Sequence, residues 1–562
     1  MLFKSELPDV EYPADLTVWE FVFENKLRAT QYHSAAGKAA GFTNGVTKER
    51  LDFLQVKEAA TYLSTALVQK YGLKSGETVS LFCNNTVWYP IAMFALLRVG
   101  GRVIGASPAY TVDEMTHALK VSEAKYLMTV PDSMGIVGPA ATAAGIPKSN
   151  ILLLEGTLNS YTTMQELLDY GRSFGVRNQA SVHHIPVGKS NREVCGFLNF
   201  SSGTTGLPKA VMVSHGNVIA QMQQLRAVAP EGTKRFLAQT PLFHISGLVR
   251  FLMWPIVNNE ECVMLPQFYL ELFLKTIVEF QITDVVLVPP LAIRLAQDPI
   301  VDKYDLRCIK RLACSSAPLS TEVLAQLEKK FPWTGFRQSY GMTETCGTLS
   351  TQTPKYYSYK YARSNGKLIP STVVKVVDVE TGKELCANQR GEIHAKGPQI
   401  TMGYLHNPKA TTETFDDQGF IHTGDVGYLD DEGFLFIVDR IKELIKVKGQ
   451  QVAPADLEDL LLGHKYVADV AVVGVPDEYS GERPKAYIVL APGNQPSESI
   501  GRKLINFVQE RRVRYKWIKE IEFLSEIPKN GSGKILRRVL REQSRGGNVG
   551  LVVKDQSGRA NL

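Results

Sequence analysis

A glycine- and hydroxyl-rich segment between two apolar runs constrains this chain most, because it predicts a tight strand-loop-strand unit. The segment runs from Leu198 to His215 and reads Leu-Asn-Phe-Ser-Ser-Gly-Thr-Thr-Gly-Leu-Pro-Lys-Ala-Val-Met-Val-Ser-His. Apolar residues lead up to Phe200 and resume at Val211. Glycines allow positive φ and bring backbone N–H groups near an anion, while the hydroxyls and the lysine add donors and charge. The pattern predicts a phosphate-binding loop.

This loop differs from the P-loop, in which Gly-x-x-x-x-Gly-Lys-Ser/Thr opens a helix. Here Lys209 follows Pro208 and precedes a β-rich run. A flexible polar hairpin also explains the Gly/Ser/Thr composition, so composition alone leaves both interpretations open. The residues expected to hold phosphate are Ser201, Ser202, Gly203, Thr204, Thr205, Gly206 and Lys209.

The length and charge of the chain describe a globular protein of several domains. Its 562 residues exceed the roughly 250–300 at which one hydrophobic core stops growing. The net charge is only +6, but residues 501–545 carry 13 Lys and Arg against 5 Glu. Basic and aromatic residues alternate too sparsely there to favour nucleic acid as a partner. A nucleotide phosphate is the simpler explanation.

Neither a membrane span nor a disulfide framework is predicted. No window of about 18 apolar residues occurs, and the first eight residues lack the apolar core of a signal peptide. The seven cysteines are scattered, form no Cys-x-x-Cys pair and have no histidine at ligand spacing. We therefore expect a soluble, non-secreted protein in a reducing compartment, with no transmembrane segment.

Strand and helix patterns alternate through the first 190 residues. Residues 78–83 are rich in β-formers, and residues 88–98 have helical apolar spacing. A short strand at 102–104 and a helix at 113–121 with a polar cap come next. This alternation predicts βαβ units and a largely parallel sheet.

Two further loops of small and polar residues follow predicted strands, as the phosphate loop does. They are Cys314–Ser320 and Gln338–Glu344. Ligands of open α/β sheets bind at the carboxyl ends of the strands. The three loops are therefore expected to face one nucleotide.

A histidine motif lies between these loops. Residues 241–247 read Pro-Leu-Phe-His-Ile-Ser-Gly and precede an apolar helix at 248–255 that carries one charge, Arg250. A lone histidine beside an apolar helix is usually a core residue. Further on, residues 372–440 read as β-rich and include Thr-Gly-Asp425, whose aspartate alone would read as a turn residue.

The C-terminal region predicts a small α+β unit, with helices and strands alternating from Pro454 to residue 524. It closes with Pro-Lys-Asn-Gly-Ser-Gly-Lys-Ile-Leu-Arg-Arg, in which the second lysine is Lys534. Two glycines before that lysine favour a mobile tip that presents one cation. A Gly-Ser-Gly-Lys segment without this context would be a linker.

Together these motifs resemble the acyl-adenylate-forming superfamily, which includes acyl-CoA synthetases, 4-coumarate-CoA ligases, beetle luciferases and nonribosomal peptide adenylation domains. The resemblance extends from about Leu7 to Leu540. It implies a large N-terminal α/β domain, residues 1–440, that binds ATP and the acyl group and contains two α/β subdomains and a distorted β-barrel. A small, mobile α+β lid domain, residues 441–562, would follow, with Lys442 as its hinge.

The resemblance implies a role for each motif. Tyr340 would stack on adenine, while Asp425 and Arg440 would contact the ribose. The implied catalytic residues are Lys534, His244, Thr343, which would touch the α-phosphate, and Glu344, which would hold Mg²⁺. Beyond the phosphate loop, the implied ATP- and AMP-binding residues are Ser315, Ser316, Ala317, Pro318, Gln338, Ser339, Tyr340, Gly341, Thr343, Asp425, Arg440, Lys446, Gln451 and Lys534.

The implied reaction has two steps. A carboxylic acid attacks the α-phosphorus of ATP to give acyl-AMP, and coenzyme A then forms the thioester. Between the steps the lid would rotate, so that Lys448 and Gly449 line the coenzyme A tunnel. Three alternatives are an enzyme that loads a carrier protein, a luciferase-like adenylate oxygenase and a non-catalytic regulator. The regulator is disfavoured because the implied phosphate, ribose, metal and lid residues are all present.

The implied acyl pocket comprises His244, Ser246, Arg250, Cys346 and Gly347. Ser246 and Arg250 are four residues apart, so they fall on one face of the predicted helix. A buried guanidinium has to be satisfied by an internal acid or by a polar group of the substrate. We therefore expect either that Arg250 is paired internally or faces solvent, or that the acid carries a second polar or anionic group.

The sequence ends in Arg-Ala-Asn-Leu562, which resembles a peroxisomal Ser-Lys-Leu type address. An arbitrary polar tail is the alternative. We expect import through a peroxisomal receptor that reads Ala-Asn-Leu, and a cytoplasmic location otherwise.

Overall fold

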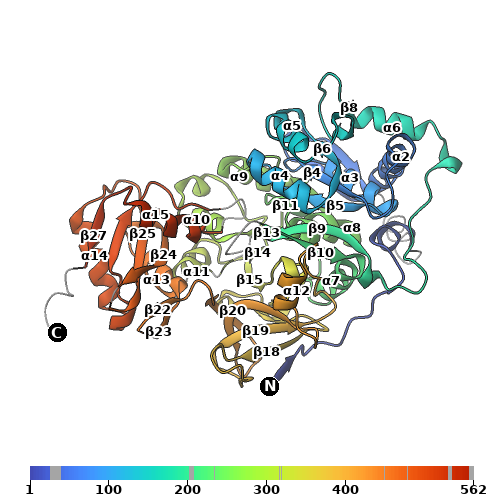
Figure 1. The fold of residues 1–562 in the computed structure, drawn as a ribbon. Coiled ribbons are helices and arrows are strands. Elements are labelled where there is room, and N and C mark those ends of the chain that lie inside the picture. Colours follow the sequence, from blue (N-terminus) through green and yellow to red (C-terminus); the bar gives the residue numbers. More distant parts are fainter. Residues whose placement is uncertain are drawn as a thin grey trace.

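The computed structural model describes residues 1–25, 39–201, 208–232, 235–315, 317, 319, 321–448, 450–477, 479–529 and 534–555. These residues form four sheets. Figure 1 shows three of the sheets grouped with their helices, and the fourth, built from the C-terminal strands, set to one side of them. The mixed α/β architecture predicted from the sequence is confirmed.

The first sheet has seven strands in the order β10-β9-β5-β4-β6-β7-β8, parallel except for the antiparallel β9–β10 pair. Its strands are β4 (Thr78–Phe82), β5 (Arg102–Gly105), β6 (Ala124–Thr129), β7 (Ile151–Leu153), β8 (Thr162–Thr163), β9 (Cys195–Ser201) and β10 (Lys209–Ser214). The associated helices are α2 (Phe53–Tyr71), α3 (Trp88–Arg98), α4 (Val112–Val121), α5 (Met134–Ala143), α6 (Met164–Arg172) and α7 (His215–Ala227). Lys209 lies opposite Ser201, which confirms the two predicted flanking strands, while residues 202–207 between them lie outside the described ranges.

The second sheet has nine strands in the order β17-β16-β15-β14-β13-β11-β12-β2-β3, with a parallel centre and antiparallel edges. The strands are β2 (Gly41–Asn44), β3 (Arg50–Asp52), β11 (Arg235–Ala238), β12 (Glu261–Met264), β13 (Asp284–Leu287), β14 (Arg311–Cys314), β15 (Gly335–Tyr340), β16 (Ser350–Thr351) and β17 (Lys367–Leu368). The helices are α8 (Trp254–Asn258), α9 (Leu270–Phe280), α10 (Pro289–Gln297) and α11 (Thr321–Lys330).

The third sheet is antiparallel throughout and matches the β-rich region predicted at 372–440. Its strands, in spatial order, are β1 (Leu2–Lys4), β18 (Val373–Val377), β19 (Gly391–Lys396), β20 (Ile421–Leu429) and β21 (Leu435–Arg440), with α12 (Pro408–Thr414) between β19 and β20 in the sequence. The N-terminal strand therefore pairs with β18, more than 360 residues away, and Figure 1 shows the N-terminus beside that strand.

The fourth sheet and three helices make the small C-terminal unit. Its strands run in the order β23-β22-β25-β26-β27, and β24 also pairs with β25. The elements are β22 (Ile445–Val447), β23 (Gln450–Val452), α13 (Pro454–Leu462), β24 (Val467–Asp477), β25 (Gly481–Leu490), α14 (Glu498–Gln509), β26 (Glu520–Phe523), α15 (Arg537–Gly546) and β27 (Val552–Lys554). The main hydrophobic cluster of this unit draws only on residues 445–553, so the unit has its own core.

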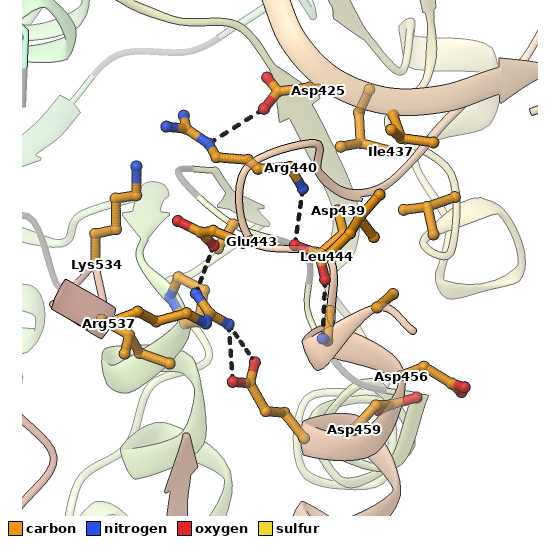
Figure 2. Close-up of a pocket in the computed structure, with 18 of the residues that line it drawn as sticks. Asp425, Ile437, Asp439, Arg440, Glu443, Leu444, Asp456, Asp459, Lys534 and Arg537 are labelled. Carbon is orange, nitrogen blue, oxygen red and sulfur yellow. Dashed lines mark hydrogen bonds and ion pairs between the residues drawn. The ribbon is translucent and has the colours of Figure 1, made fainter. Parts of the chain in front are cut away.

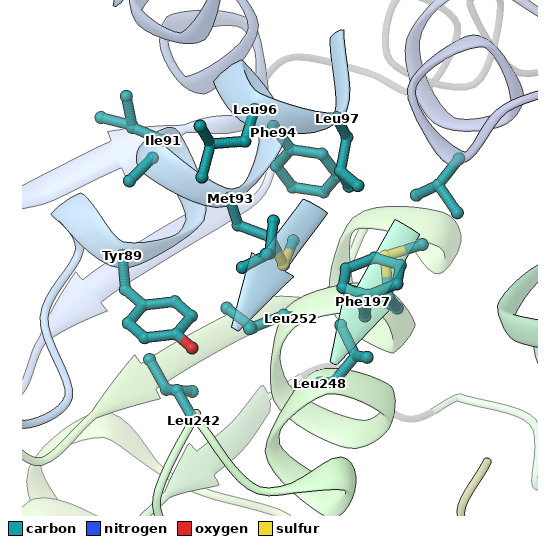
Figure 3. Close-up of a cluster of buried hydrophobic side chains, with 14 of the residues drawn as sticks. Tyr89, Ile91, Met93, Phe94, Leu96, Leu97, Phe197, Leu242, Leu248 and Leu252 are labelled. Atoms are coloured by element: carbon teal, nitrogen blue, oxygen red, sulfur yellow. The ribbon is translucent and has the colours of Figure 1, made fainter. Parts of the chain in front are cut away.

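The segment predicted as an apolar helix at 248–255 differs from the prediction. It begins as a π-helical turn over Gly247–Met253 and continues as α8. Figure 3 shows why this segment is apolar: Leu248 and Leu252 pack against Met93 of α3 and Phe197 of β9 in one buried cluster. A π-helical turn interrupts the regular helical register, and such turns are frequent at functional sites.

The capping signals of the sequence explain several helix starts. Thr111 caps α4, and its hydroxyl accepts from the backbone N–H of Glu114 while the Glu114 carboxylate accepts from Thr111 in return. This reciprocal arrangement satisfies two backbone or hydroxyl donors at the first turn. Within the described ranges, no helix combines the length and apolar character that crossing a bilayer requires.

Candidate active site

A cavity of about 610 Å³ lies where strand ends of the first, second and third sheets meet. A second cavity, of about 670 Å³, opens toward the small C-terminal unit. The two cavities share the lining residues Ser339, Tyr340, Gly341, Arg440 and Lys534. They therefore adjoin at these residues, which come from β15, β21 and the lid.

Most predicted site residues within the described ranges border one of the two cavities. Those that line the first are Ser201, Lys209, His244, Ser246, Arg250, Ser315, Ser339, Tyr340, Gly341, Thr343, Glu344, Gly347, Arg440, Lys442 and Lys534. Ala317, Asp425 and Gln451 line the second. The fold thus brings together residues that are more than 300 positions apart in the sequence.

Lys209 and Glu344 stand at one end of the first cavity and are linked by Tyr404. The Tyr404 hydroxyl donates to Glu344 Oε1 at 2.9 Å, and Lys209 Nζ lies 4.7 Å from the centre of the Tyr404 ring. Burial raises the pKa of the Tyr404 phenol, and the adjacent Glu344 carboxylate raises it further. A neutral phenol therefore holds the carboxylate in place while the lysine charge stays available beside it.

Asp425, which is buried, pairs with Arg440, which is partly buried, on adjacent strands. They are direct register partners on β20 and β21, and Arg440 Nε lies 3.1 Å from Asp425 Oδ1. The Tyr340 hydroxyl donates to the other Asp425 oxygen at 2.7 Å. Burial lowers the pKa of Arg440, but the carboxylates of Asp425 and Glu443 outweigh this and raise it. The arrangement presents a fixed carboxylate, a guanidinium and an aromatic ring to the cavity.

Lys534 of the lid reaches this pair, as Figure 2 shows. Burial lowers the pKa of the Lys534 amine to about 8 and Arg440 adds to that effect, whereas Glu443 and Asp425 oppose it. At neutral pH most of the amine is protonated, so the C-terminal unit contributes a positive charge beside Asp425 and Arg440, at the predicted nucleotide end of the cavity.

Arg537 holds the lid segment in position. Its guanidinium bonds Glu443 at 2.8 Å and both oxygens of Glu458, at 2.8 and 2.7 Å (Figure 2). Glu443 belongs to the turn after β21 and Glu458 to α13, so one arginine ties the start of α15 to both. Burial alone would lower the pKa of Arg537, but the two carboxylates raise it.

His244 and Ser246, which are predicted to line the acyl pocket, also border the first cavity, and we call their part of it the predicted acyl end. His244 Nδ1 is 2.9 Å from Ser246 Oγ and accepts from the Ser246 N–H at 3.3 Å. Burial lowers the pKa of the imidazole to about 4, so the ring is neutral at pH 7. Because Nδ1 accepts, the single ring proton is on Nε2, which makes the ring a neutral hydrogen-bond donor.

Arg250 and Arg337 border the same end of the cavity. Arg337 donates from Nη1 to the Tyr357 hydroxyl at 2.6 Å. Burial lowers the pKa of Arg250 to about 9, and the charge of Arg337 contributes, so the two guanidiniums are close enough to repel. Among the described residues, neither guanidinium has a carboxylate partner within ion-pair distance. The internal pairing of Arg250 that the sequence left open is therefore not found within the described ranges.

Among the described residues, four predicted site residues line neither cavity: Gln338, Cys346, Lys446 and Lys448. Gln338 is buried, and its amide bonds the backbone of Leu319 and Ala362, so it supports a loop. Cys346 is buried with φ of +47°. Lys446 and Gln451 are exposed register partners on β22 and β23. Lys448 stacks on the exposed ring of Tyr479, 3.5 Å from its centre, and borders neither cavity.

Several predictions fall on residues outside the described ranges. They concern Ser202, Gly203, Thr204, Thr205, Gly206, Ser316, Pro318, Gly449 and the C-terminal Ala-Asn-Leu. The roles of all site residues remain predictions.

Four site residues were not predicted: Arg337, Tyr404, Glu443 and Arg537. The sequence could have indicated Arg337, because a charged residue in a largely buried strand, directly before Gln338, is unusual and suggests a function. Arg537 ends the quoted run Lys-Ile-Leu-Arg, four positions after a glycine, and an arginine there had no assigned use. Tyr404 and Glu443 carried no local signal, since their partners Glu344 and Arg537 are distant in sequence.

The single carboxylate of Glu344 fits Mg²⁺. Glu344 borders the cavity, is buried and keeps one oxygen bonded to Tyr404. Magnesium usually takes one or two carboxylates and fills its remaining positions with water and substrate phosphates. Within the described part of the chain, the clustered group of three metal-ligand side chains is His394, Asp416 and His422, which does not include Glu344.

Comparison with known protein families defines the class. Residues 30–405 match the model of the AMP-binding enzyme family, and residues 456–534 match the AMP-binding enzyme C-terminal domain. The first match alone covers about two thirds of the chain. The chain therefore belongs to the AMP-binding enzyme family, which confirms the resemblance drawn from the motifs.

Curated relatives of this chain within the family are named as CoA ligases. The chain is 35% identical over 549 residues to 4-coumarate–CoA ligase-like 1 of Arabidopsis thaliana, covering 96% of this chain and 97% of the relative. It is 34% identical to 4-coumarate–CoA ligase 1 of Petroselinum crispum, with 98% of both chains covered. It is also 34% identical to peroxisomal OPC-8:0-CoA ligase 1 of Arabidopsis thaliana over 89% of each chain.

Solved structures share the fold. The anthranilate CoA ligase AuaEII in complex with anthranoyl-AMP superimposes with a TM-score of 0.83 at 24% identity, covering 95% of this chain and 98% of that one. ATP-bound RpMatB-BxBclM chimera B1 follows with a TM-score of 0.82 at 25% identity, covering 94% and 99%. The predicted fold, with its small C-terminal unit, is thus that of known adenylate-forming enzymes.

Proposed function

We propose that this protein is an AMP-forming acid–thiol ligase that activates a carboxylic acid with ATP and transfers the acyl group to coenzyme A. The observation that carries the proposal is that Lys534 lies beside the Asp425–Arg440 pair, and that Lys534 and Arg440 line one cavity together with Lys209, Glu344 and His244. A nucleotide, its phosphates and a carboxylate each find complementary groups there. The family and the names of the relatives support the same reaction class.

In the first half-reaction, the substrate carboxylate attacks the α-phosphorus of ATP, and pyrophosphate leaves. Asp425 accepts from ribose hydroxyls, and Lys209 balances charge on the outer phosphates. Lys534 neutralises the charge that develops between the carboxylate and the α-phosphate, which is the main contribution a protein makes to such transfers. Glu344 would hold Mg²⁺, which neutralises phosphate charge when bound.

In the second half-reaction, the coenzyme A thiolate attacks the carbonyl carbon of acyl-AMP, the C–S bond forms and AMP leaves. His244 can donate from Nε2 to the acyl group without carrying a charge of its own. Lys448 lies outside both cavities in this arrangement. The proposal therefore includes a rotation of residues 441–562 about Lys442 that replaces Lys534 with Lys448 and Gly449 at the acyl end.

A carboxylate-library screen tests the function. Purified protein with MgATP is expected to release pyrophosphate with at least one acid and, after addition of coenzyme A, to yield the acyl-CoA detected by mass spectrometry. Lys534→Ala is the inactive control, and Lys554→Ala, an exposed lysine of β27, is the matched active control. Acylation of a carrier protein in place of coenzyme A, or oxygen consumption, would replace this function with one of its alternatives.

The location is a separate part of the proposal. A relative is named as peroxisomal, which supports import through a receptor that reads Ala-Asn-Leu. A fluorescent protein bearing the last twelve residues is expected to enter peroxisomes in a host cell. The same fusion ending in Ala-Asn-Asp serves as control, and a diffuse signal from the unaltered fusion contradicts the proposal.

A further inference from the structure

Two parts of the fold line the acyl end of the first cavity: neighbouring strands of the second sheet and the π-helical turn. Val286, Ala313 and Arg337 are register partners across β13, β14 and β15, so their side chains form one row, and all three line the cavity. The π-helical turn contributes Val249 and Arg250 to the same lining. The cavity wall therefore combines the apolar side chains of Val286 and Ala313 with two arginines.

The arginine pair is separate from the nucleotide end. The charged groups that perturb Lys534 are Arg440, Glu443, Asp425 and Arg537. Those that act on Arg250 are Arg337 and Tyr357. Arg250 and Arg337 line only the first cavity, whereas Lys534 and Arg440 line both cavities.

A neighbouring arginine shows how this fold satisfies such a residue internally. Arg311, on β14, forms a two-bond pair with Asp284 of β13, with Nη2 at 2.8 Å from Oδ2. Arg337 lies on the next strand and donates to the hydroxyl of Tyr357, and no described carboxylate lies within ion-pair distance of it. Two guanidiniums that line one cavity without a carboxylate partner among the described residues are unfavourable unless an anion joins them.

Resting on the proposed function, we infer that the acid has a second carboxylate, which binds between Arg250 and Arg337 while its first carboxylate is activated near His244 and Lys534. The planar guanidinium fork binds a carboxylate with two parallel hydrogen bonds, which suits this chemistry better than an ammonium would. The preferred substrate class is therefore a dicarboxylic acid, with an apolar spacer over Val286 and Ala313.

The test compares each α,ω-dicarboxylic acid from three to ten carbons with its monomethyl ester, using MgATP and pyrophosphate release. At the best chain length, the diacid is expected to exceed its ester at least tenfold in kcat/KM. Arg250→Met and Arg337→Met should each lower kcat/KM for the diacid tenfold or more and change that for the ester less than threefold. Arg250→Lys should retain part of the preference. Arg307→Met, an exposed arginine, is the matched control and should change neither.

Calorimetric binding of the same acids without ATP separates this inference from the proposed activity. Diacid binding that depends on Arg250, without pyrophosphate release from any acid, would support the subsite and overturn the activity. Release with an unchanged order of preference in both arginine variants would overturn the subsite and leave the activity. Absence of binding of any diacid, together with absence of pyrophosphate release from any acid of the carboxylate library, would overturn both. Correct folding of each variant is checked by ATP binding.

Discussion

The two ends of the active site differ in whether their cationic side chains are paired with carboxylates of the protein. At the nucleotide end, Arg440 lies against Asp425, and Arg537 bonds Glu443 and Glu458. At the acyl end, Arg250 and Arg337 line the same cavity, and Arg337 donates to the hydroxyl of Tyr357. The first set is paired within the protein, whereas the second has no carboxylate partner among the described residues, which is the basis of the inferred subsite for a second substrate carboxylate.

This difference separates structure from recognition. A buried cation that is paired internally fixes the position of an element, as Arg537 does for the lid. A buried cation without an internal acid destabilises the ligand-free protein and strengthens the binding of an anion. The predictions that follow test whether the two ends respond to mutation as differently as this reasoning requires.

The largest effect is expected on stability at the nucleotide end. Arg537→Met leaves Glu443 and Glu458 buried without their cation and should lower the free energy of unfolding by about 3–5 kcal/mol. Urea denaturation measures the change. Arg538→Met is the matched control, because Arg538 is exposed and pairs with the exposed Glu542, so it should cost about 0.5 kcal/mol or less. Equal losses in the two variants would show that the lid is not held by Arg537.

Lys534→Ala should reduce the rate of acyl-adenylate formation by about 10²–10³, since a charge at the developing negative centre is lost. Thioester formation from supplied acyl-adenylate should survive, because that step is proposed to follow withdrawal of the lysine. Single-turnover assays of the two half-reactions give both rates. A bulky substitution at Gly449 is expected to show the reverse pattern. Equal loss in both half-reactions would contradict the proposal that the lid takes a different position in each step.

The pH dependence of the first half-reaction follows from the pKa of Lys534. The folded-state value of about 8 lies below the ordinary value of 10.5, so the amine is charged below pH 8 and neutral above it. Values of kcat/KM for pyrophosphate release should therefore fall above pH 8 by about tenfold per unit. Lys534→Arg should keep its charge and remove this decline. A wild-type profile that stays flat to pH 9.5 would contradict the assignment.

The smallest effect is expected on stability at the acyl end. Arg250→Met removes an unpaired charge, so the free energy of unfolding of the ligand-free protein should be unchanged or higher, by up to about 1 kcal/mol. Urea denaturation beside Arg537→Met gives the direct comparison. A loss of the size expected for Arg537→Met would mean that Arg250 is paired internally, and the two ends would then not differ.

Many elements followed from local sequence. Helix α3 spans the predicted residues 88–98, and α4 begins at the capping threonine. The ends of β9 and β14 were also predictable, because apolar runs and turn residues are local signals. The end of β15 was not, because this strand continues to Tyr340, into the loop predicted at Gln338–Glu344. The π-helical turn was not predicted, since the same apolar spacing fits an α-helix and only packing against α3 and β9 selects between them.

The sequence by itself determined the family, the reaction class it implies and the motif residues, because those signals are carried by short, specific words such as the loop before Lys209 and the lid segment before Lys534. The tertiary structure alone decided which charges meet. The register of β13, β14 and β15 places Arg337 in the row with Val286 and Ala313, and chain packing brings Arg250 to it across 87 positions. Such contacts depend on sheet order and packing between distant segments, which leave no local pattern in a single sequence.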